Sequence, residues 1–419
     1  MKKTFLLSCL MLAAMPVMAA YTGHVYVDKN KNGVFDQSEK PLAGIKVSDG
    51  LNVVETAADG SFTLPGHERE RFIFITTPSG YKTFNRHYHK IEKKQSGYDF
   101  GLIPYSGRIR KNGSHRYIHI ADTEIFNTEN HADWVNNVRD YARNEQAAFI
   151  IHTGDICYEK GLKAHIKLMN TENMDCPVFY CIGNHDLVKG KYGEELFESI
   201  YGPVYYSFDA GNVHYVVTPM PGGDHAPGYT SDDVCRWLKN DLAHIRPGTP
   251  VVVFNHDLLT YEDTFIFKSK NAGSINLNEY NLKAWVYGHW HINYMKKQGD
   301  VYSVCTSSLD KGGIDHSTTA FRVVHVDSKG DFTSELRYTY LDKNICIASP
   351  AGVMASGVLP VAVNVYSSVS PVREVLYTCL ADGKPVLKNK RLLQSTDWSW
   401  NGELPLSHKY VGKELTLRV

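Results

Sequence analysis

The sequence lacks an excess of either charge, and it lacks a long apolar run beyond its first twenty residues. Its 45 basic and 45 acidic residues cancel, and no basic patch points to a nucleic-acid partner. A transmembrane helix needs about 20 consecutive apolar residues, which no later stretch supplies. Internal repeats and low-complexity tracts are also missing. What is left is a globular chain with 43% hydrophobic residues, enough to form large cores.

Cysteine is scarce, with eight among 419 residues. Eight minus Cys9, which lies in a leader, leaves seven, so at least one thiol is unpaired. Several of the seven sit in or beside apolar runs, as Cys181 and Cys305 do. Buried free cysteine is the commoner state of such residues. We therefore predict no disulfide framework.

The first residues have the layout of an export signal. Lys2-Lys3 form a positive start, residues 5–14 are apolar, and Val17-Met18-Ala19 offers small residues for cleavage. We expect residues 1–20 to be a signal peptide and the mature chain to be exported, to the periplasm or the cell surface. A lipid anchor at Cys9 is the alternative.

At about 100 to 200 residues per domain, the length predicts two to four units. Residues 21–105 contain short strand-like runs separated by Gly and Asp or Asn turns, which is typical of a small β-sandwich. Residues 335–419 also have all-β composition, and an α/β region, 110–330, lies between. Trp398 and Trp400 alternate near the end. We interpret them as packing within a sandwich, with a carbohydrate platform as the alternative.

A segment of the first unit is rich in oxygen ligands. Positions 1, 3, 5, 9 and 12 of the stretch are Asp28, Asn30, Asn32, Asp36 and Glu39, with glycine at position 6. This is the pattern of a calcium loop, flanked by strands instead of EF-hand helices. The segment resembles the calcium loop of bacterial surface B-type repeat domains. A polar hairpin held by Asx turns without metal is the alternative.

Five short apolar runs in the middle of the chain are each followed by polar residues suited to metal binding. The runs read as buried strands and span residues 117–120, 148–151, 178–182, 251–254 and 284–287. The polar residues are Asp122, Gly154-Asp155, Gly183-Asn184-His185-Asp186, Asn255-His256 and Gly288-His289-Trp290-His291. Ligands gather at the carboxyl ends of strands in an open α/β sheet. We therefore expect one shared site, a metal centre.

This order of motifs resembles the calcineurin-like metallophosphoesterase family, in an exported bacterial form. The resemblance covers residues 115–325. It implies an α/β catalytic core, a metallophosphoesterase-type β-sandwich flanked by helices, with small all-β domains at both ends. It also implies two divalent or trivalent metal ions, a metal-bound hydroxide as nucleophile, and a small phosphate-ester substrate.

The resemblance also assigns roles to the motif residues. One metal would be held by Asp122, Glu124, Asp155 and His291, and the other by Asp155, Asn184, His256 and His289. Asp155 would bridge the two ions, because a carboxylate has two oxygens. His185 would protonate the leaving oxygen, with its charged form steadied by Asp186.

Glu124 departs from the family pattern, which has histidine at this position. A carboxylate ligand hardens that half of the site, so manganese, magnesium or iron is favoured over zinc. The alternative is that Glu124 points away and one metal is weakly held.

The sequence thus predicts a hydrolase of phosphodiesters or phosphomonoesters. A proton donor favours alkyl-type leaving groups, such as those of sugars, nucleosides or glycerol. Two insertions, 219–233 and 261–279, are expected to shape the pocket. The competing hypothesis is a catalytically decayed core that acts as a cell-surface glycan-binding protein. The oligomeric state is left open.

Overall fold

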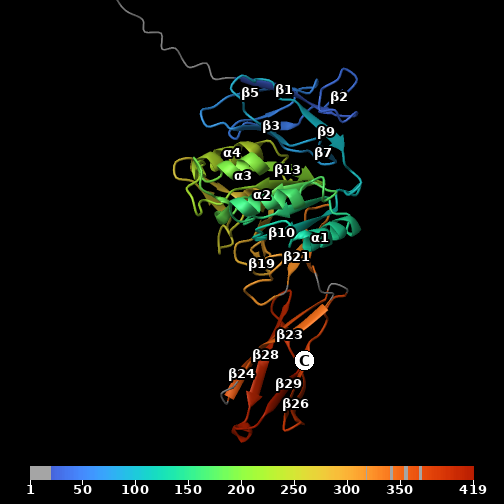
Figure 1. The fold of residues 1–419 in the computed structure, drawn as a ribbon, viewed down its shortest axis with the longest axis vertical. Coiled ribbons are helices and arrows are strands. Elements are labelled where there is room, and N and C mark those ends of the chain that lie inside the picture. Colours follow the sequence, from blue (N-terminus) through green and yellow to red (C-terminus); the bar gives the residue numbers. More distant parts are fainter. Residues whose placement is uncertain (1–19, 318, 340–342, 353–356, 368–369) are drawn as a thin grey trace, which may run out of the picture.

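The computed structural model describes residues 20–317, 319–339, 343–352, 357–367 and 370–419. Figure 1 shows three stacked parts: an amino-terminal unit, a broad core in the middle, and a narrow carboxyl-terminal unit at the far end. Apart from Ala20, the predicted signal peptide lies outside the described residues. Across the described ranges, no helix has the length and apolar character needed to cross a membrane.

Two small sheets form the amino-terminal unit. One has the order β2-β1-β9-β7, with β5 also paired to β1, and the other has the order β4-β3-β6-β8. Their bounds are β1 Ala20–Val27, β2 Lys40–Pro41, β3 Lys46–Ser48, β4 Val53–Glu55, β5 Ser61–Pro65, β6 Phe72–Ile75, β7 Tyr81–Thr83, β8 Tyr88–Lys90 and β9 Phe100–Pro104. Alternate side chains, such as those of Val25, Phe62 and Ile73, are buried in one apolar cluster, because successive residues of a strand face opposite sides. The unit is therefore a β-sandwich.

The core contains two mixed sheets, ordered β12-β11-β10-β21-β22 and β13-β14-β15-β18-β20-β19. The first comprises β10 His115–Ile120, β11 Phe149–His152, β12 Val178–Tyr180, β21 Ala320–Val326 and β22 Phe332–Tyr338. The second comprises β13 Tyr206–Ala210, β14 Val213–Val217, β15 Val251–Phe254, β18 Leu282–Tyr287, β19 Tyr294–Gln298 and β20 Val301–Cys305. Because β22 pairs with β21 along its whole length, the core extends to Tyr338, past the expected boundary near residue 335.

Helices cover the outer faces of these sheets. They are α1 Ala132–Asn144, α2 Tyr158–Leu168, α3 Glu195–Tyr201 and α4 Ser231–Ala243. Tyr117 stacks on Phe149 with ring centroids 4.8 Å apart and belongs to the apolar cluster between the sheets. The next residue, Ile118, belongs instead to the cluster beneath Trp134 of α1. Trp237 of α4 packs against the second sheet. The period-2 alternation of each strand therefore fills both faces of its sheet.

The carboxyl-terminal unit is also a pair of antiparallel sheets, ordered β23-β24-β28-β27 and β26-β25-β29. Its strands are β23 Lys343–Ser349, β24 Gly357–Ser367, β25 Leu376–Ala381, β26 Lys384–Arg391, β27 Leu393–Gln394, β28 Ser399–Leu406 and β29 Leu415–Arg418. Trp400 is buried in the core of this unit, and half-buried Trp398 packs against Tyr338 and Tyr366. Both indoles thus serve packing, as interpreted from the sequence, and neither forms an open carbohydrate platform.

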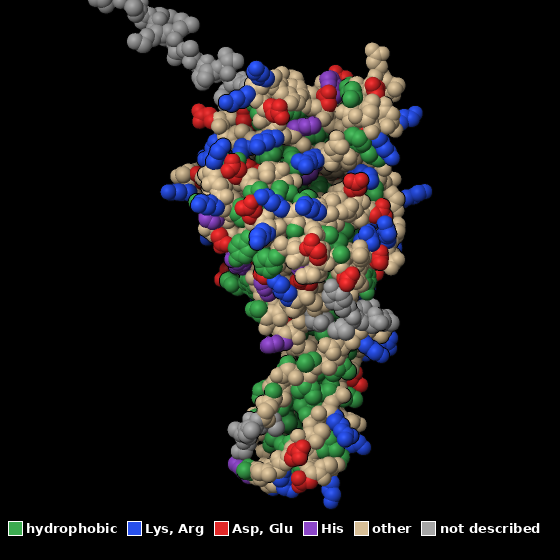
Figure 2. Space-filling model, in the orientation of Figure 1, with side chains coloured by type: hydrophobic (Ala, Val, Ile, Leu, Met, Phe, Trp, Pro, Cys, Tyr) green, Lys and Arg blue, Asp and Glu red, His purple; other side chains and the backbone are tan. Residues whose placement is uncertain are grey.

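Two further observations match the expectations from composition. All seven cysteines in the described part of the chain are free thiols, as predicted. On the face shown in Figure 2, acidic and basic side chains are interspersed over the core without a field of one sign.

Candidate metal centre

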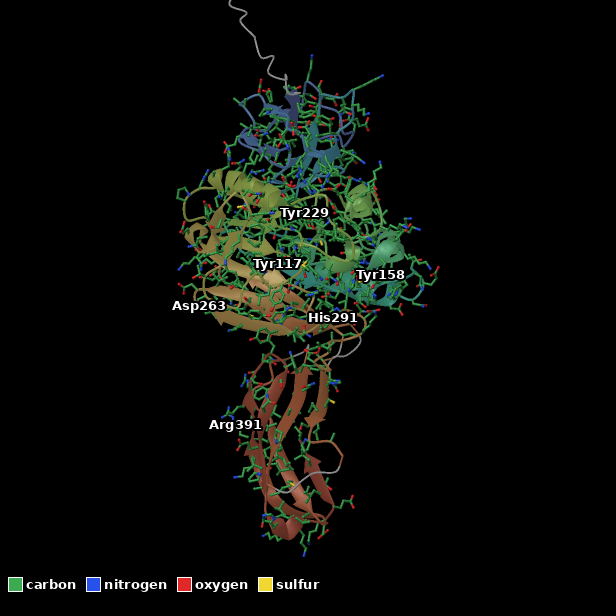
Figure 3. All side chains as sticks on the ribbon, turned by 90° about the vertical axis from the view of Figure 1, so that its left-hand side faces the viewer. Tyr117, Tyr158, Tyr229, Asp263, His291 and Arg391 are labelled. Carbon is green, nitrogen blue, oxygen red and sulfur yellow. The ribbon has the colours of Figure 1, made fainter. Side chains whose placement is uncertain are left out.

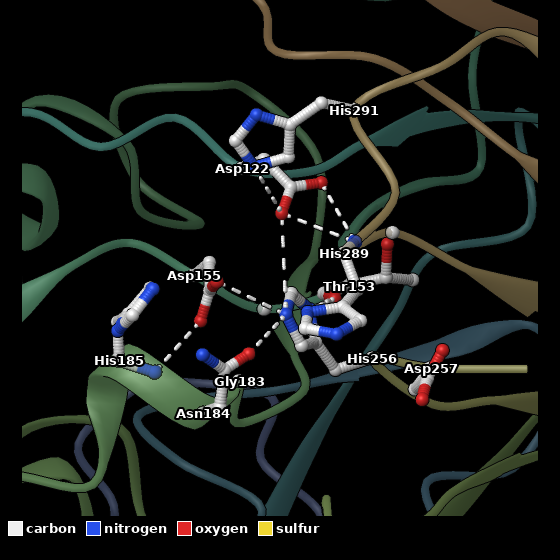
Figure 4. Close-up of polar contacts among 12 residues, drawn as sticks. Asp122, Thr153, Asp155, Gly183, Asn184, His185, His256, Asp257, His289 and His291 are labelled. Atoms are coloured by element: carbon white, nitrogen blue, oxygen red, sulfur yellow. Dashed lines mark hydrogen bonds and ion pairs between the residues drawn. The ribbon is translucent and has the colours of Figure 1, made fainter. Parts of the chain in front are cut away.

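The carboxyl ends of the core strands bring the predicted ligands together (Figure 4). Strands β10, β11 and β12 are parallel to one another, as are β15 and β18, so their final residues meet at one edge of each sheet. One ligand atom each of Asp155, His256 and His289 lies within 4.8 Å of the others. The sequence hypothesis of one shared site therefore holds in the geometry.

The tautomer of His256 can be read from its contacts. Its Nδ1 lies 2.7 Å from the Thr153 carbonyl oxygen, which can only accept, so Nδ1 carries a hydrogen and donates it. Nε2 faces Asp155 Oδ2 and Asn184 Oδ1, both at 3.1 Å. A ring nitrogen aimed at two oxygen acceptors is suited to share a cation with them, and the bond to Thr153 fixes the ring for this purpose.

The electrostatics of His256 also indicate a cation site. Burial opposes the charged form of the ring, but Asp155 and Asp122 outweigh burial and raise the pKa of His256 to about 9. The buried carboxylates of Asp155 and Asp122 therefore stabilise a positive charge next to them. A metal ion between the same groups would supply that charge and keep the ring neutral.

The second half of the site is built around Asp122. Its Oδ1 lies 3.4 Å from His291 Nε2, and both of its oxygens accept the backbone N–H of His289 at 3.1 Å. Glu124 Oε1 lies 3.5 Å from the same His291 nitrogen. Glu124 therefore faces the site, and the alternative that it points away is not what the structure shows.

Lys311 pairs with this unusual glutamate. Its Nζ lies 2.9 Å from Glu124 Oε2. The added negative charge of Glu124 is therefore partly balanced by a lysine from a distant loop. No motif in the sequence singled out Lys311, because nothing in its local pattern relates it to a residue 187 positions earlier.

The backbone at the ligand positions is unusual. Positive φ angles of 43° to 67° occur at five of the seven predicted metal ligands: Asp122, Glu124, Asp155, His289 and His291. Residues with side chains adopt this left-handed region rarely, at a cost of order 1–3 kcal/mol each. Close packing adds to the constraint, because a Cβ on Gly183 would lie 2.2 Å from Asp155 Oδ1. Such strain clusters at functional sites, where it aims side chains at a common point.

The structure corrects the partner of His185. Its Nδ1 lies 2.8 Å from Asp224 Oδ2, in the loop that precedes α4. Burial lowers the pKa of His185, but Asp224 and Asp155 outweigh it and the net pKa is raised. Asp224 therefore takes the part expected of Asp186. The run Gly222-Gly223-Asp224-His225 was visible within the first insertion, but nothing in it identified this role.

Asp186 has a different task. It is fully buried, and its oxygens accept the backbone N–H groups of Asp155, Cys157 and Gly183, each at 2.9 Å. Burial, with the nearby charge of Asp155, raises the pKa of Asp186 to about 7. Asp186 thus ties together the two loops that follow β11 and β12, and so positions Asp155 and Asn184.

Comparisons with known proteins give the site a context. Residues 29–104 match the family described as N terminal of calcineurin-like phosphoesterase, and residues 115–293 match calcineurin-like phosphoesterase. Purple acid phosphatase 13 of Arabidopsis thaliana is 26% identical over 215 residues, which cover 48% of this chain and 36% of that protein. The aligned region therefore spans about a third of that relative's length.

Solved structures with similar folds include a putative 5'-nucleotidase from Staphylococcus aureus, 12% identical with a TM-score of 0.34. The similarity covers 54% of each chain. GAP50 of Plasmodium is 15% identical with a TM-score of 0.33, covering 54% of this chain and 85% of that one. The predicted fold class, a metallophosphoesterase-type core with all-β segments at both ends, is confirmed.

Proposed function

Because residues 29–104 and 115–293 are the N-terminal and catalytic domains of the calcineurin-like phosphoesterase family, we propose that the protein hydrolyses phosphate esters through a dinuclear metal centre. The observation that carries this proposal is the convergence of Asp155, His256 and His289 at the strand ends. Two bound metal ions would activate a water and stabilise the charge of the phosphoryl group.

The residues of the site are assigned to two metal ions, one near Asp122 and the other near His256. In the proposal one ion is held by Asp122, Glu124, Asp155 and His291, and the other by Asp155, Asn184, His256 and His289. Asp155 is the bridging ligand. The hydrogen bond from His256 to the Thr153 carbonyl oxygen and the hydrogen bond from the Asp155 backbone N–H to Asp186 hold these ligands in place before metal binds.

His185 supplies the proton for the leaving oxygen. Its Nδ1 is engaged by Asp224, which leaves Nε2 to donate toward a bound ester. Alkoxide leaving groups need this proton, whereas activated aryl oxides do not, so a positioned acid contributes about a hundredfold or more for alkyl esters. Phosphodiesters and phosphomonoesters with alkyl-type leaving groups are the proposed substrates.

The central test removes the bridging ligand. Asp155→Ala should abolish hydrolysis of an aryl phosphate and lower the content of both metal ions, because both lose a ligand. Metal analysis by mass spectrometry should accompany the assay. A variant that kept its activity at unchanged metal content would disprove the dinuclear assignment.

The acid role has its own test. His185→Ala should slow an alkyl ester about a hundredfold more than an aryl ester of the same type. Asp224→Asn should have a smaller effect in the same direction, because the ring is kept and only its partner is weakened. Equal losses on both esters would reduce His185 to a positioning residue.

The identity of the metals follows from Glu124. We propose manganese, iron or magnesium ahead of zinc, since a carboxylate replaces a nitrogen ligand. Glu124→His should shift the metal content of the purified protein toward zinc. An unchanged content would make Glu124 a bystander.

Two further expectations remain proposals. We propose export, from the leader-like residues 1–20, and calcium binding by the loop from Asp28 to Glu39. Both of these carboxylates are buried, and they accept backbone N–H groups of the loop, which is also how metal-free Asx turns are held. Calcium added after chelation should raise the melting temperature of the parent but not of Glu39→Ala. No rise in the parent would leave a metal-free hairpin.

A further inference from the structure

A cavity of about 650 Å³ is lined by Asn255 and Asp257, the residues on either side of the predicted metal ligand His256. Most of its lining comes from two segments that overlap the predicted insertions 219–233 and 261–279. One runs from Pro219 to Val234 in the first turn of α4, and the other from Asp257 to Lys268 at the end of strand β16 (Ile266–Lys268). Apolar side chains make up the larger part of its inner surface, and Ser231, Thr260 and Thr264 are among its polar residues. Met220, Tyr229 and Trp285 are buried, while Leu258 and Phe267 are half-buried in its walls.

The first loop joins this cavity to the catalytic acid. From Met220 in the cavity wall it runs to Gly223, where an added Cβ would lie 2.3 Å from the Asn184 carbonyl oxygen. The next residue, Asp224, donates its backbone N–H to that oxygen at 3.1 Å and holds His185 through its carboxylate. One short segment therefore contacts a metal ligand, positions the acid and lines the cavity.

The second loop begins at a metal ligand. Asp257 directly follows His256 and lines the cavity. Its carboxylate accepts the indole N–H of Trp290 at 3.0 Å, and its backbone oxygen accepts that of Trp285 at 2.8 Å. Trp290 itself lies between His289 and His291 in the sequence. In Figure 3, Asp263 of this loop and Tyr158 lie on opposite sides of His291. The second loop, several of whose residues line the cavity, therefore lies on one side of the metal centre.

We infer that this cavity binds an apolar organic group of the phosphate ester while its phosphoryl group sits at the metals. The inference rests on the proposed function and narrows its substrate class. Half-buried leucine and phenylalanine side chains favour alkyl carbon over the hydroxyl groups of a sugar, because each buried methylene is stabilised by transfer from water. The charged residues Glu262 and Lys268 lie at the exposed rim and have opposite signs. Together with Asp257, they give the lining one net negative charge, which disfavours an anionic organic group.

A second cavity, of about 360 Å³, provides an internal control. It lies between the amino-terminal unit and the core. Unlike the first cavity, it is lined by no residue that is adjacent in sequence to a predicted metal ligand. Ile166 of α2 is one of its half-buried apolar residues. A substitution there matches one in the first cavity in chemistry, without touching the proposed alkyl subsite.

The test compares primary n-alkyl phosphates from ethyl to octyl, and the corresponding methyl n-alkyl diesters, with the metal-loaded full chain. Beyond ethyl the leaving alkoxide is chemically the same, so only apolar area varies. We expect kcat/KM to rise about two- to fourfold per added methylene until the chain fills the cavity. Leu258→Gln should lower the octyl-to-ethyl ratio at least about tenfold, and Leu258→Trp should move the optimum to a shorter chain. Ile166→Gln should leave the ratio unchanged.

The outcomes distinguish a failure of the alkyl subsite from a failure of the proposed phosphoesterase function. Hydrolysis of all esters with equal kcat/KM would overturn the alkyl subsite and leave the proposed function intact. A ratio equally sensitive to Leu258→Gln and Ile166→Gln would overturn it too, since the loss would then reflect general loosening of the fold. No hydrolysis of any ester at any metal loading would overturn both the alkyl subsite and the proposed function.

Discussion

The two all-β ends of the chain differ in how they join the core. At the amino-terminal end, Phe72, Phe74 and Tyr88 belong to the same apolar cluster as the second core sheet. Arg71 crosses the boundary to reach Glu194 at 2.7 Å and Glu198 at 2.8 Å, and both carboxylates are almost fully buried. The amino-terminal unit is therefore continuous with the core.

The carboxyl-terminal unit has an apolar cluster of its own. Its described links to the core include the indole N–H of Trp398 donating to the Asn293 carbonyl, and Arg322 paired with Asp397 at 2.7 Å. Tyr338 also stacks on Tyr366, within an apolar cluster of four buried residues that is far smaller than the one shared at the amino-terminal end. Shared apolar burial decides whether a module unfolds with its neighbour. We therefore expect the amino-terminal unit to unfold with the core and the carboxyl-terminal unit to unfold separately.

The largest expected effect comes from the buried ion pairs. At pH 8, Arg71→Met should destabilise the core and amino-terminal unit by about 3–5 kcal/mol, because it leaves buried carboxylates without a cation. Urea unfolding followed by tryptophan fluorescence measures the loss. Arg69→Met is the matched control, since Arg69 is half exposed in its pair with Asp233 and should cost less than about 1 kcal/mol. Equal losses in the two variants would show that the boundary is not held by buried charge.

A smaller effect should appear as a dependence on pH. Burial, with Glu194 adding to it and Arg71 opposing, raises the pKa of Glu198 from 4.5 to about 7. The folded chain therefore holds this proton more tightly than the unfolded chain, and the stability it contributes below pH 4.5 is lost as the pH rises through 7. The loss between pH 5 and 8 should be of order 1–3 kcal/mol.

Glu198→Gln isolates this contribution, because glutamine mimics the protonated acid and does not titrate. Denaturant unfolding at several pH values should give a flatter profile for the variant than for the parent. A parallel slope in both proteins would assign the pH dependence to other groups.

The smallest effect is expected at the other junction. Trp398→Phe keeps most of the aromatic surface and removes one hydrogen bond, so the carboxyl-terminal transition should lose about 1 kcal/mol. The core transition should stay in place, as calorimetry can resolve. If the core transition shifted by the same amount, the core and the carboxyl-terminal unit would unfold as one cooperative unit. The two ends of the chain would then not differ in how they join the core.

The sequence predicted which residues gather at the candidate metal centre because each follows a strand, and parallel strands bring their ends to the same edge of a sheet. Asp122, Asp155 and His256 could be found in this way. Contacts between loops could not, since loop conformation depends on distant packing. Asp224 and Lys311 were missed for this reason. Asp186 was predicted to steady His185 because the two are adjacent in sequence, but Asp224 is the residue that contacts His185. The ion pairs of Arg71 were equally invisible, because they join residues more than 100 positions apart.

The left-handed backbone at five predicted ligand positions affects which residue would be most stable there. Each of these residues costs about 1–3 kcal/mol relative to glycine, which adopts the same conformation freely. A glycine at any of these positions would relieve that strain, but at Asp122 or Asp155 it would also remove a carboxylate that accepts a backbone N–H. This chain has aspartate, glutamate or histidine at all five. Side chains able to bind a cation therefore occupy the positions where the backbone conformation alone would favour glycine.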